Sequence, residues 1–237
     1  LDKTRTAMGA RLLRSYVEQP LIDEDEINAR LDAVEALTGQ AMIREEIREY
    51  LRPVYDLERL VGRISYQSAN PRDLIAFKSS LQMLPYIKQL LNSFDGDALA
   101  QIQEDLDPLE DLYQLVDAAI VDDPPYLMRD GGMIKDGYNE TVDNYRHAKT
   151  EGKQWLSELE ASEREKTGIK NMKVKYNKVF GYYIEVSNSF KEQVPEDYIR
   201  KQTLVNGERY ITQELKDLEH EVLTAHDRDA ALEYDLL

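Results

Sequence analysis

The fold is decided by one stretch of the sequence, KVKYNKVFGYYIEV, which occupies Lys173–Val186. Valine, isoleucine and tyrosine alternate there with polar side chains, and this spacing of two is typical of β-strands. The residues NKVFG separate two such segments, so the sequence predicts a β-hairpin or a meander with strands over residues 169–176 and 181–186. Because long stretches on both sides have helical spacing, a small β-containing unit is predicted between helices.

A long helix is predicted after this unit. Its apolar residues follow alternating steps of four and three, which is the pattern of a coiled-coil seam, with Asp229 as a polar interruption. The seam consists of Ile211, Leu215, Leu218, Val222, Ala225, Leu232 and Leu236. Between the hairpin and this helix, residues 195–202 are expected to form a short helical or irregular piece, and VNGE at residues 205–208 predicts a turn.

A second long helix is predicted before the hairpin, from Tyr138 to about Lys166. Lys149 and Gly152 weaken the middle of its apolar stripe, which consists of Tyr138, Val142, Tyr145, Leu156 and Leu159. Two helices that enter and leave one insertion should pair as an antiparallel coiled coil. The alternative is that both helices pack separately on a globular body.

The sequence from Leu1 to about Asp130 has helical spacing nearly throughout. The apolar faces of its first two helices are expected to be Leu12, Leu13, Tyr16 and Val17, and then Ile27, Leu31, Val34 and Leu37. Pro71 and Pro108 lie where further helices should begin, because a proline costs little in the first turn. Proline and glycine cluster at residues 122–137, which is the strongest break in the chain.

These patterns predict a mainly α fold, in which a helical bundle carries long antiparallel coiled-coil helices and a small α+β tip. The expected domains are a helical body at residues 1–136, an outgoing helix at 137–165, the tip at 166–210 and a returning helix at 211–237.

The composition excludes several classes of protein. The 237 residues include 46 Asp and Glu against 30 Lys and Arg, a net charge of −16, which argues against general adhesion to nucleic acid or anionic membranes. The sequence has no Cys, which excludes disulfide chemistry and fits a reducing compartment, so a cytoplasmic location is expected. No apolar run approaches the ~20 residues that cross a bilayer, so no membrane partner is expected. Because the chain lacks an initial Met and stops within a helical pattern, it is expected to be an excerpt of a longer protein.

Charge is distributed unevenly along the chain. Residues 164–211 contain ten Lys and Arg against six Asp and Glu, a net charge of +4, whereas the rest of the chain carries −20. Lys173 and Lys175 should share one face of the sheet, since they are two residues apart, and the other face should carry Met172, Val174 and Tyr176. Cations interleaved with aromatic residues are typical of phosphate-binding surfaces. The alternative is a solvated strand face above a small core filled by tyrosines.

The candidate site is therefore a surface that binds the phosphates of a nucleic acid backbone. Ammonium and guanidinium groups form charge-assisted bonds with phosphate, and amide groups add neutral donors. The candidate residues are Lys173, Lys175, Asn177, Lys178, Lys201, Asn206 and Arg209. The first four lie on or beside the hairpin and the others in a segment expected to fold back against it, so both groups are expected to face a single groove. Base reading is not expected.

Motifs for catalysis and for cofactor binding are absent from the sequence. It contains no phosphate-binding loop of the form GxxxxGK[ST], no GxGxxG fingerprint and no GxSxG nucleophile elbow. His147, His220 and His226 lack the spacing of zinc ligands, and no pair of carboxylates stands out as a general acid and base. We therefore expect no catalytic residue, no metal and no cofactor within this chain.

Several stretches resemble the MutS family of DNA mismatch-repair proteins. LDKTRTAMGARLL at residues 1–13, DLERL at 56–60 and PRDL at 71–74 resemble the core, or lever, domain of that family. TGI at residues 167–169, the stretch Lys173–Val186, QTL at 202–204 and ERYI at 208–211 resemble the clamp domain inserted into the lever. Where the family usually has TPEL, this chain has TQEL at residues 212–215, so the start of that helix is expected to differ slightly.

The resemblance implies a function in DNA mismatch repair. It implies that the tip clamps the duplex DNA backbone without sequence preference, and that the lever couples this binding to the ATPase of the full-length protein. The implied partners are double-stranded DNA that contains a mismatch, a second copy in a homodimer, and downstream mismatch-repair proteins. ATP and magnesium would bind outside this chain, as would the mismatch-reading segment. The alternative function is a helical protein-protein interaction scaffold whose basic tip docks an acidic partner.

Overall fold

The structure is a computed structural model that describes residues 2–94 and 96–237. Leu1, which begins the first stretch that resembles the lever, lies outside the described residues. The chain divides into two compact units, which we call unit 1 (Leu1–Met128) and unit 2 (Arg129–Leu237). The predicted fold class is confirmed, because the chain is mainly α with a small antiparallel sheet. None of the described helices is both long and apolar enough to cross a membrane.

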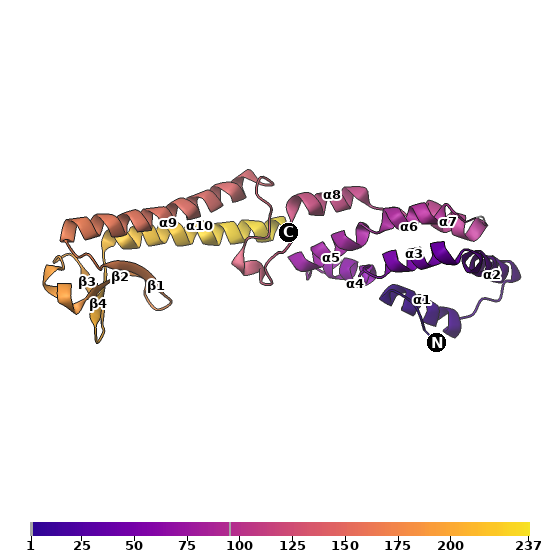
Figure 1. The fold of residues 1–237 in the computed structure, drawn as a ribbon, viewed down its shortest axis with the longest axis horizontal. Helices are drawn as coiled ribbons and strands as arrows, with labels where there is room; N and C mark the ends of the chain where they lie inside the picture. The colour runs from indigo at the N-terminus through magenta and orange to yellow at the C-terminus, as the bar shows by residue number, and fades with distance from the viewer. Residues whose placement is uncertain (1, 95) are drawn as a thin grey trace. The chain divides into compact units, whose positions relative to one another are not determined.

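Unit 1 is built from short helices (Figure 1). They are α1 (Ala7–Glu18), α2 (Glu24–Gly39), α3 (Ala41–Leu51), α4 (Leu57–Ser65), α5 (Pro71–Leu81), α6 (Leu84–Leu91), α7 (Asp97–Asp105) and α8 (Glu110–Ala119). The predicted helix starts have the expected chemistry: Asn70 and Asp73 form a reciprocal capping box, with Pro71 in the first turn of α5. Asp23 caps α2 through its carboxylate, which accepts from the Glu26 N–H.

The apolar faces predicted for α1 and α2 are largely exposed. Val17 of α1 is 75% exposed, and Leu31 and Val34 of α2 are each 59% exposed. Instead, α2 packs against the core with Leu37 and two short side chains, Ala33 and Ala36. The predicted inner face of α2 is therefore wrong in part, because alanines allow this helix to approach its neighbours closely and the bulkier residues lie outward.

Unit 2 contains two long helices, α9 (Glu140–Thr167) and α10 (Gln213–Leu236), which lie side by side and antiparallel (Figure 1). Asn139 and Thr212 cap their N-termini through side-chain oxygens. The seam between the helices differs from the predicted one at its ends. Ile211 belongs to a strand, and Tyr138 precedes α9. Beyond Ala225, the buried positions of α10 are Asp229 and Glu233 rather than Leu232 and Leu236.

Gly152 lies where α9 and α10 approach each other closely. A Cβ atom at Gly152 would lie 2.4 Å from Cγ2 of Val222 on the opposite helix. The sequence predicts that this glycine weakens the apolar stripe. The structure corrects this prediction, since a glycine allows the two backbones to come close and Val222 fills the space.

The sheet contains β1 (Lys173–Asn177), β2 (Gly181–Ser187), β3 (Ile199–Thr203) and β4 (Gly207–Ile211) in the order β1-β2-β4-β3. The predicted hairpin is β1–β2, although β1 starts at Lys173 because Ile169 and Met172 are buried in the turn that precedes it. The prediction of a helical or irregular piece at 195–202 is wrong for its second half. β3 lies there as an edge strand, and a short 3₁₀ helix spans Asn188–Gln193.

One face of the sheet packs on the two helices. Ile184, Val186 and Tyr210 of the sheet form a core with Leu156 of α9 and Leu215 of α10. Side chains at alternate positions of β2 and β4 therefore point away from the helices. This second face, which we call the outer face, carries Lys173, Lys175 and Arg209 of the candidate site.

Candidate nucleic-acid interface

The outer face brings together three of the predicted cations. Lys173 and Lys175 lie on β1 and are paired in register with Glu185 and Tyr183 of β2. Glu185 is in turn paired with Arg209 of β4. Because Tyr183 and Glu185 alternate with the buried Ile184 and Val186, all five of these residues share the outer face. The two-residue spacing of the lysines is therefore sufficient to predict their common face.

Glu185 lies between cations from two different strands. Its Oε1 atom is 3.0 Å from Lys175 Nζ, and its Oε2 atom is 3.2 Å from Arg209 Nε. The hydrogen bond from Lys175 lowers the pKa of Glu185, and Arg209 adds to this effect, although burial opposes it. Glu185 is therefore a carboxylate ion at neutral pH, and it neutralises part of the basic surface.

Arg209 is held flat against the sheet. Its guanidinium carbon lies 4.6 Å from the centre of the Tyr183 ring, and its Nη1 atom donates to Gln202 Oε1 at 2.9 Å. Phe180 packs edge-on against the same tyrosine, with ring centres 5.4 Å apart. A guanidinium has five N–H groups, so donors for a phosphate remain after the bonds to Glu185 and Gln202.

The β1–β2 turn presents Lys178. Asn177 builds this turn, because its Oδ1 atom accepts from the backbone N–H groups of Val179 at 2.9 Å and Phe180 at 3.0 Å. Lys216 of α10 anchors the turn from below by donating to the Phe180 carbonyl at 2.6 Å. Lys178 is exposed on this fixed turn. The structure therefore assigns the oxygen of Asn177 to the fold and leaves its amide nitrogen as a donor.

Asn206 lies at the opposite end of the sheet, whereas Lys201 lies on the edge strand β3, between residues paired with Tyr210 and Arg209 of β4. Asn177 pairs with Gly181 at one end of β2, whereas Ser187 pairs with Gly207 at the other, six residues away. At ~3.3 Å per residue, the two turns are separated by about 20 Å. We call the part of the outer face between these two turns the strip. The seven predicted residues are spread over this strip, its two turns and the edge strand β3, rather than gathered in one compact cluster.

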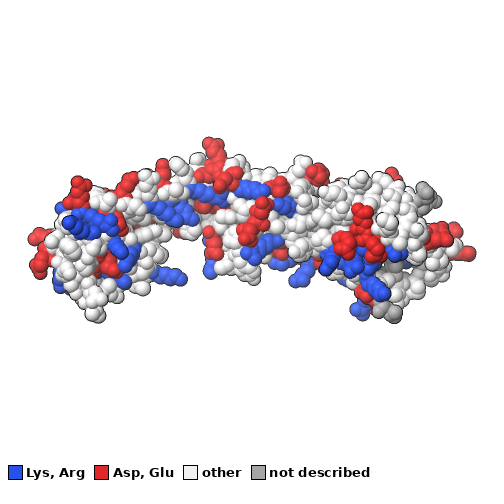
Figure 2. All heavy atoms as spheres, viewed as in Figure 1, with Lys and Arg blue, Asp and Glu red and all other residues white. Residues whose placement is uncertain are grey.

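Two other cations of the tip serve the fold. Lys191 and Arg200 lie 3.1 and 3.5 Å from the Oε1 atom of Glu208, whose carboxylate is almost completely buried and also accepts from the Tyr210 hydroxyl. The hydrogen bond from Tyr210 lowers the pKa of Glu208, and Lys191 adds to this effect. Both signs of charge accordingly lie at the sheet end of unit 2 in Figure 2.

Sequence reasoning missed Glu185 and Gln202 as members of this surface, whereas Tyr183 is one of the aromatic residues that the sequence interleaves with its cations. Arg209 donates hydrogen bonds to Glu185 and Gln202, and its guanidinium group lies over the ring of Tyr183. The missing signal was the register between β2 and β4, since only this pairing places Glu185 beside Arg209. Among the described residues, no group of His, Asp or Glu has an arrangement that could hold a metal ion.

Residues 1–233 match the family MutS domain III. The chain belongs to the MutS family. A DNA mismatch repair protein MutS from Lachnoclostridium phytofermentans is 62% identical over 236 residues, which is 100% of this chain and 25% of that protein. The proteins of the same name from Ruminiclostridium cellulolyticum and Caldanaerobacter subterraneus are 55% and 56% identical over 236 residues, which is 27% of each. The chain thus spans about a quarter of these MutS relatives.

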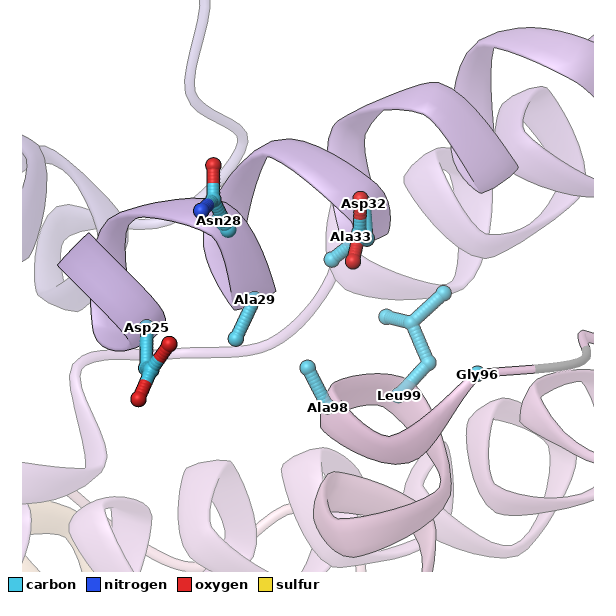
Figure 3. Close-up of a pocket in the computed structure, with 8 residues that line it drawn as sticks. All are labelled: Asp25, Asn28, Ala29, Asp32, Ala33, Gly96, Ala98 and Leu99. Carbon is cyan, nitrogen blue, oxygen red and sulfur yellow. The ribbon is translucent and has the colours of Figure 1, made fainter.

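Unit 1 of this MutS domain contains a cavity of about 400 Å³ between α2 and the beginning of α7 (Figure 3). Asp25, Asn28 and Asp32 of α2 line it, opposite Ala98 and Leu99. The described residues of its lining include two carboxylates and no Lys or Arg, so the cavity does not suit a phosphate group. The cations of the outer face therefore remain the better candidate for a nucleic acid.

A second polar cluster of the MutS domain lies at the other end of the helix pair, which we call the base. The Glu233 carboxylate is completely buried and accepts from the backbone N–H groups of Gly132, Met133 and Ile134, at 3.1, 2.5 and 3.3 Å. Gly131 and Gly132 have positive φ angles of 65° and 78°, which only glycine adopts easily. Successive backbone N–H groups in a turn can form a concave anion site, and here the Glu233 carboxylate accepts from three of them.

Arg146 completes the base cluster from α9. Its Nη2 atom pairs with Glu233 and also donates to the Ile134 carbonyl at 2.8 Å, while Nη1 lies 2.7 Å from Asp136. Asp229, one helical turn before Glu233, is buried 3.9 Å from Arg146 Nε, and its Oδ1 atom has no hydrogen-bond partner among the described residues. Burial and the neighbouring Glu233 raise the pKa of Asp229. The base is therefore a structural anchor.

Proposed function

We propose that the tip of unit 2, residues 166–210, is a clamp that holds the backbone of duplex DNA without reading its sequence. The proposed role of α9 and α10 is that of a lever, with the lever body at residues 1–136 and the two lever helices at 137–165 and 211–237. The function of the whole protein is proposed to be DNA mismatch repair. The observation that carries the proposal is the rigid outer face, on which Lys173, Lys175 and Arg209 converge.

The dimensions of the strip support this proposal. DNA rises ~3.4 Å per base pair, so a strip of about 20 Å runs beside roughly six base pairs. Lys173 and Lys178 are exposed on the strip and its β1–β2 turn, and Lys201 is exposed on the edge strand β3. Among the described residues none of the three makes an ion pair. Flexible ammonium groups on a fixed sheet suit phosphates at a regular spacing, whereas base reading needs side chains that enter a groove.

ATP binding, mismatch reading and the contacts with other protein chains are proposed to lie outside this chain. The family resemblance implies an ATPase that uses ATP and magnesium, a homodimer, and downstream repair proteins as partners, and the names of the relatives support a role in DNA mismatch repair. In this proposal the chain itself transmits DNA binding through the helix pair and performs no catalysis.

A salt titration tests the clamp. We expect the 237-residue chain to bind duplexes of unrelated sequence equally, with log affinity that falls linearly with log salt concentration. The combined variant Lys173→Ala, Lys178→Ala and Arg209→Ala should lower the salt slope by roughly three units, one for each cation. A matched control removes three exposed cations of unit 1, Lys3, Arg14 and Arg52, and should change the slope far less. Equal DNA affinity and slope in wild type and the clamp variant would place the DNA surface elsewhere.

The same titration distinguishes the alternative function. An interaction scaffold would bind an acidic protein more tightly than duplex DNA at the same salt concentration.

A matched and a mismatched duplex should bind the chain equally, and a tenfold preference, about 1.4 kcal/mol, would contradict a backbone clamp.

A further inference from the structure

We propose that Glu185 is an internal counter-ion of the outer face, which occupies Lys175 and Arg209 in the absence of DNA and thereby limits how tightly the clamp holds. This inference rests on the proposed function, because it concerns the same surface. In this view, a DNA phosphate takes the place of the Glu185 carboxylate beside its two cations.

The position of Glu185 carries the inference. β2 separates β1 from β4 in the sheet, so Lys175 and Arg209 come from strands that do not touch each other. Glu185 lies between them and uses one oxygen for each, at 3.0 and 3.2 Å. Two cations that bracket one anion are the arrangement that a phosphate would need, and a carboxylate satisfies the same donors.

The exposure of the cluster makes the exchange feasible. The side chains of Lys175, Glu185 and Arg209 are 45%, 26% and 22% exposed, so water and ions reach all three. Ion pairs that remain in contact with water contribute little to stability and are screened by salt. Tyr183 and Gln202 hold Arg209 independently of Glu185, so the guanidinium stays in place when its anion changes.

The clamp is therefore weaker than its cations alone would make it. The negative charge of Glu185, which lies within hydrogen-bonding distance of Lys175 and Arg209, repels the phosphates of DNA. It also reduces by about one the number of counter-ions that binding releases. A moderate affinity suits a surface that must let DNA go.

The variant Glu185→Gln tests this inference, because it keeps the shape of the side chain and removes the charge. We expect the variant to bind a fully matched duplex roughly three- to tenfold more tightly at low salt, with a salt slope steeper by about one unit. The control Glu192→Gln makes the same change of net charge on the exposed 3₁₀ helix of the tip and should change affinity less than about twofold.

A double variant shows whether the gain passes through the two cations. In a chain that already carries Lys175→Ala and Arg209→Ala, Glu185→Gln should give no more tightening than Glu192→Gln does. The inference would be overturned if Glu185→Gln raised the DNA affinity equally in the wild-type chain and in the chain that lacks the two cations. It would also be overturned if Glu185→Gln lowered the DNA affinity while the circular dichroism spectrum stayed unchanged. If Lys173→Ala, Lys178→Ala and Arg209→Ala leave DNA binding unchanged, the proposed function itself fails. If they weaken it but Glu185→Gln does not strengthen it, only the counter-ion role fails.

Discussion

Two glutamate–arginine pairs of unit 2, Glu233–Arg146 and Glu185–Arg209, differ in what surrounds them. At the base, Glu233 is completely buried and is bonded to three backbone N–H groups in addition to Arg146. On the outer face, Glu185 is 26% exposed, and its partners are the side chains of Lys175 and Arg209. The first carboxylate is held by the fold of the main chain, whereas the second is held by groups that another anion can engage.

The difference shows that an ion pair has no fixed role of its own. A buried carboxylate that lost its partners would be left without solvation, so the base pair is costly to disturb. A partly hydrated carboxylate exchanges one set of partners for another at little cost. The same two residue types therefore anchor one end of the helix pair and are proposed to regulate binding at the other.

The largest effect is expected for Glu233→Gln, which should lower the free energy of unfolding of unit 2 by about 3–5 kcal/mol. The amide removes the charge that Arg146 neutralises, and it has a single oxygen for three N–H donors. The sequence contains one Trp, Trp155 in α9, so its fluorescence during urea unfolding reports unit 2 alone. Asp235→Asn, on an exposed position of the same helix, is the control and should stay within about 0.5 kcal/mol. A loss of less than 1 kcal/mol for Glu233→Gln would remove the distinction between the two pairs.

The helix pair that joins the two regions is tested by Gly152→Ala. The new Cβ would lie 2.4 Å from Val222 Cγ2, so the helices must separate or Val222 must move, at a cost of about 1–3 kcal/mol that exceeds the gain in helix propensity. Val222→Ala in the same chain should restore much of the loss, because it removes the methyl group that clashes. Urea unfolding followed by Trp155 measures both variants. If Gly152→Ala stabilised the chain, the helices would not be in close contact at this position.

The pH dependence of stability should separate the base from the outer face. The pKa of Asp229 is raised in the folded protein, so folding favours its protonated form and this residue contributes less stability as the pH rises. The groups that face it are Glu233, Arg146 and Lys149. Asp229→Asn should therefore gain stability relative to wild type between pH 4 and pH 7. If the difference in free energy of unfolding between the two proteins did not change with pH, folding would not raise the pKa of Asp229.

The smallest effect is expected for Glu185→Gln, which should change the free energy of unfolding by less than about 1 kcal/mol at neutral pH. Its pKa is lowered in the folded protein, so the contribution of Glu185 is present above its ordinary pKa and is lost as the pH falls. This trend is opposite to that of Asp229. Thermal unfolding of the two single variants at pH 4 and pH 7 compares them directly. If Glu185→Gln lowered the free energy of unfolding as much as Glu233→Gln does, the pair on the outer face would also be a structural anchor.

The sequence was sufficient to predict those elements whose side chains follow a regular period. α9, α10 and the β1–β2 hairpin are of this kind, and so is the shared face of Lys173 and Lys175. β3 was not predictable because all five of its side chains are exposed, which leaves no alternation to detect. The role of Glu233 could not be predicted because its partners include backbone N–H groups, which every residue except proline has and which therefore leave no pattern in the sequence. The place of Glu185 depended on the pairing of β2 with β4, which is a tertiary property.

The order of the strands leaves β1 and β3 at the two edges of the sheet, and Glu160 of α9 accepts from one N–H group of β1, that of Val174, at 2.7 Å. An open edge presents unpaired N–H and carbonyl groups to which a strand of another molecule can add, and such additions lead to aggregates. Both edges carry cations, Lys173 and Lys175 on β1 and Arg200 and Lys201 on β3, and β3 is also interrupted by an irregularity between Arg200 and Gln202. The lysines proposed to bind phosphate therefore have a second physical consequence: their like charges oppose the pairing of one sheet edge with the same edge of another copy.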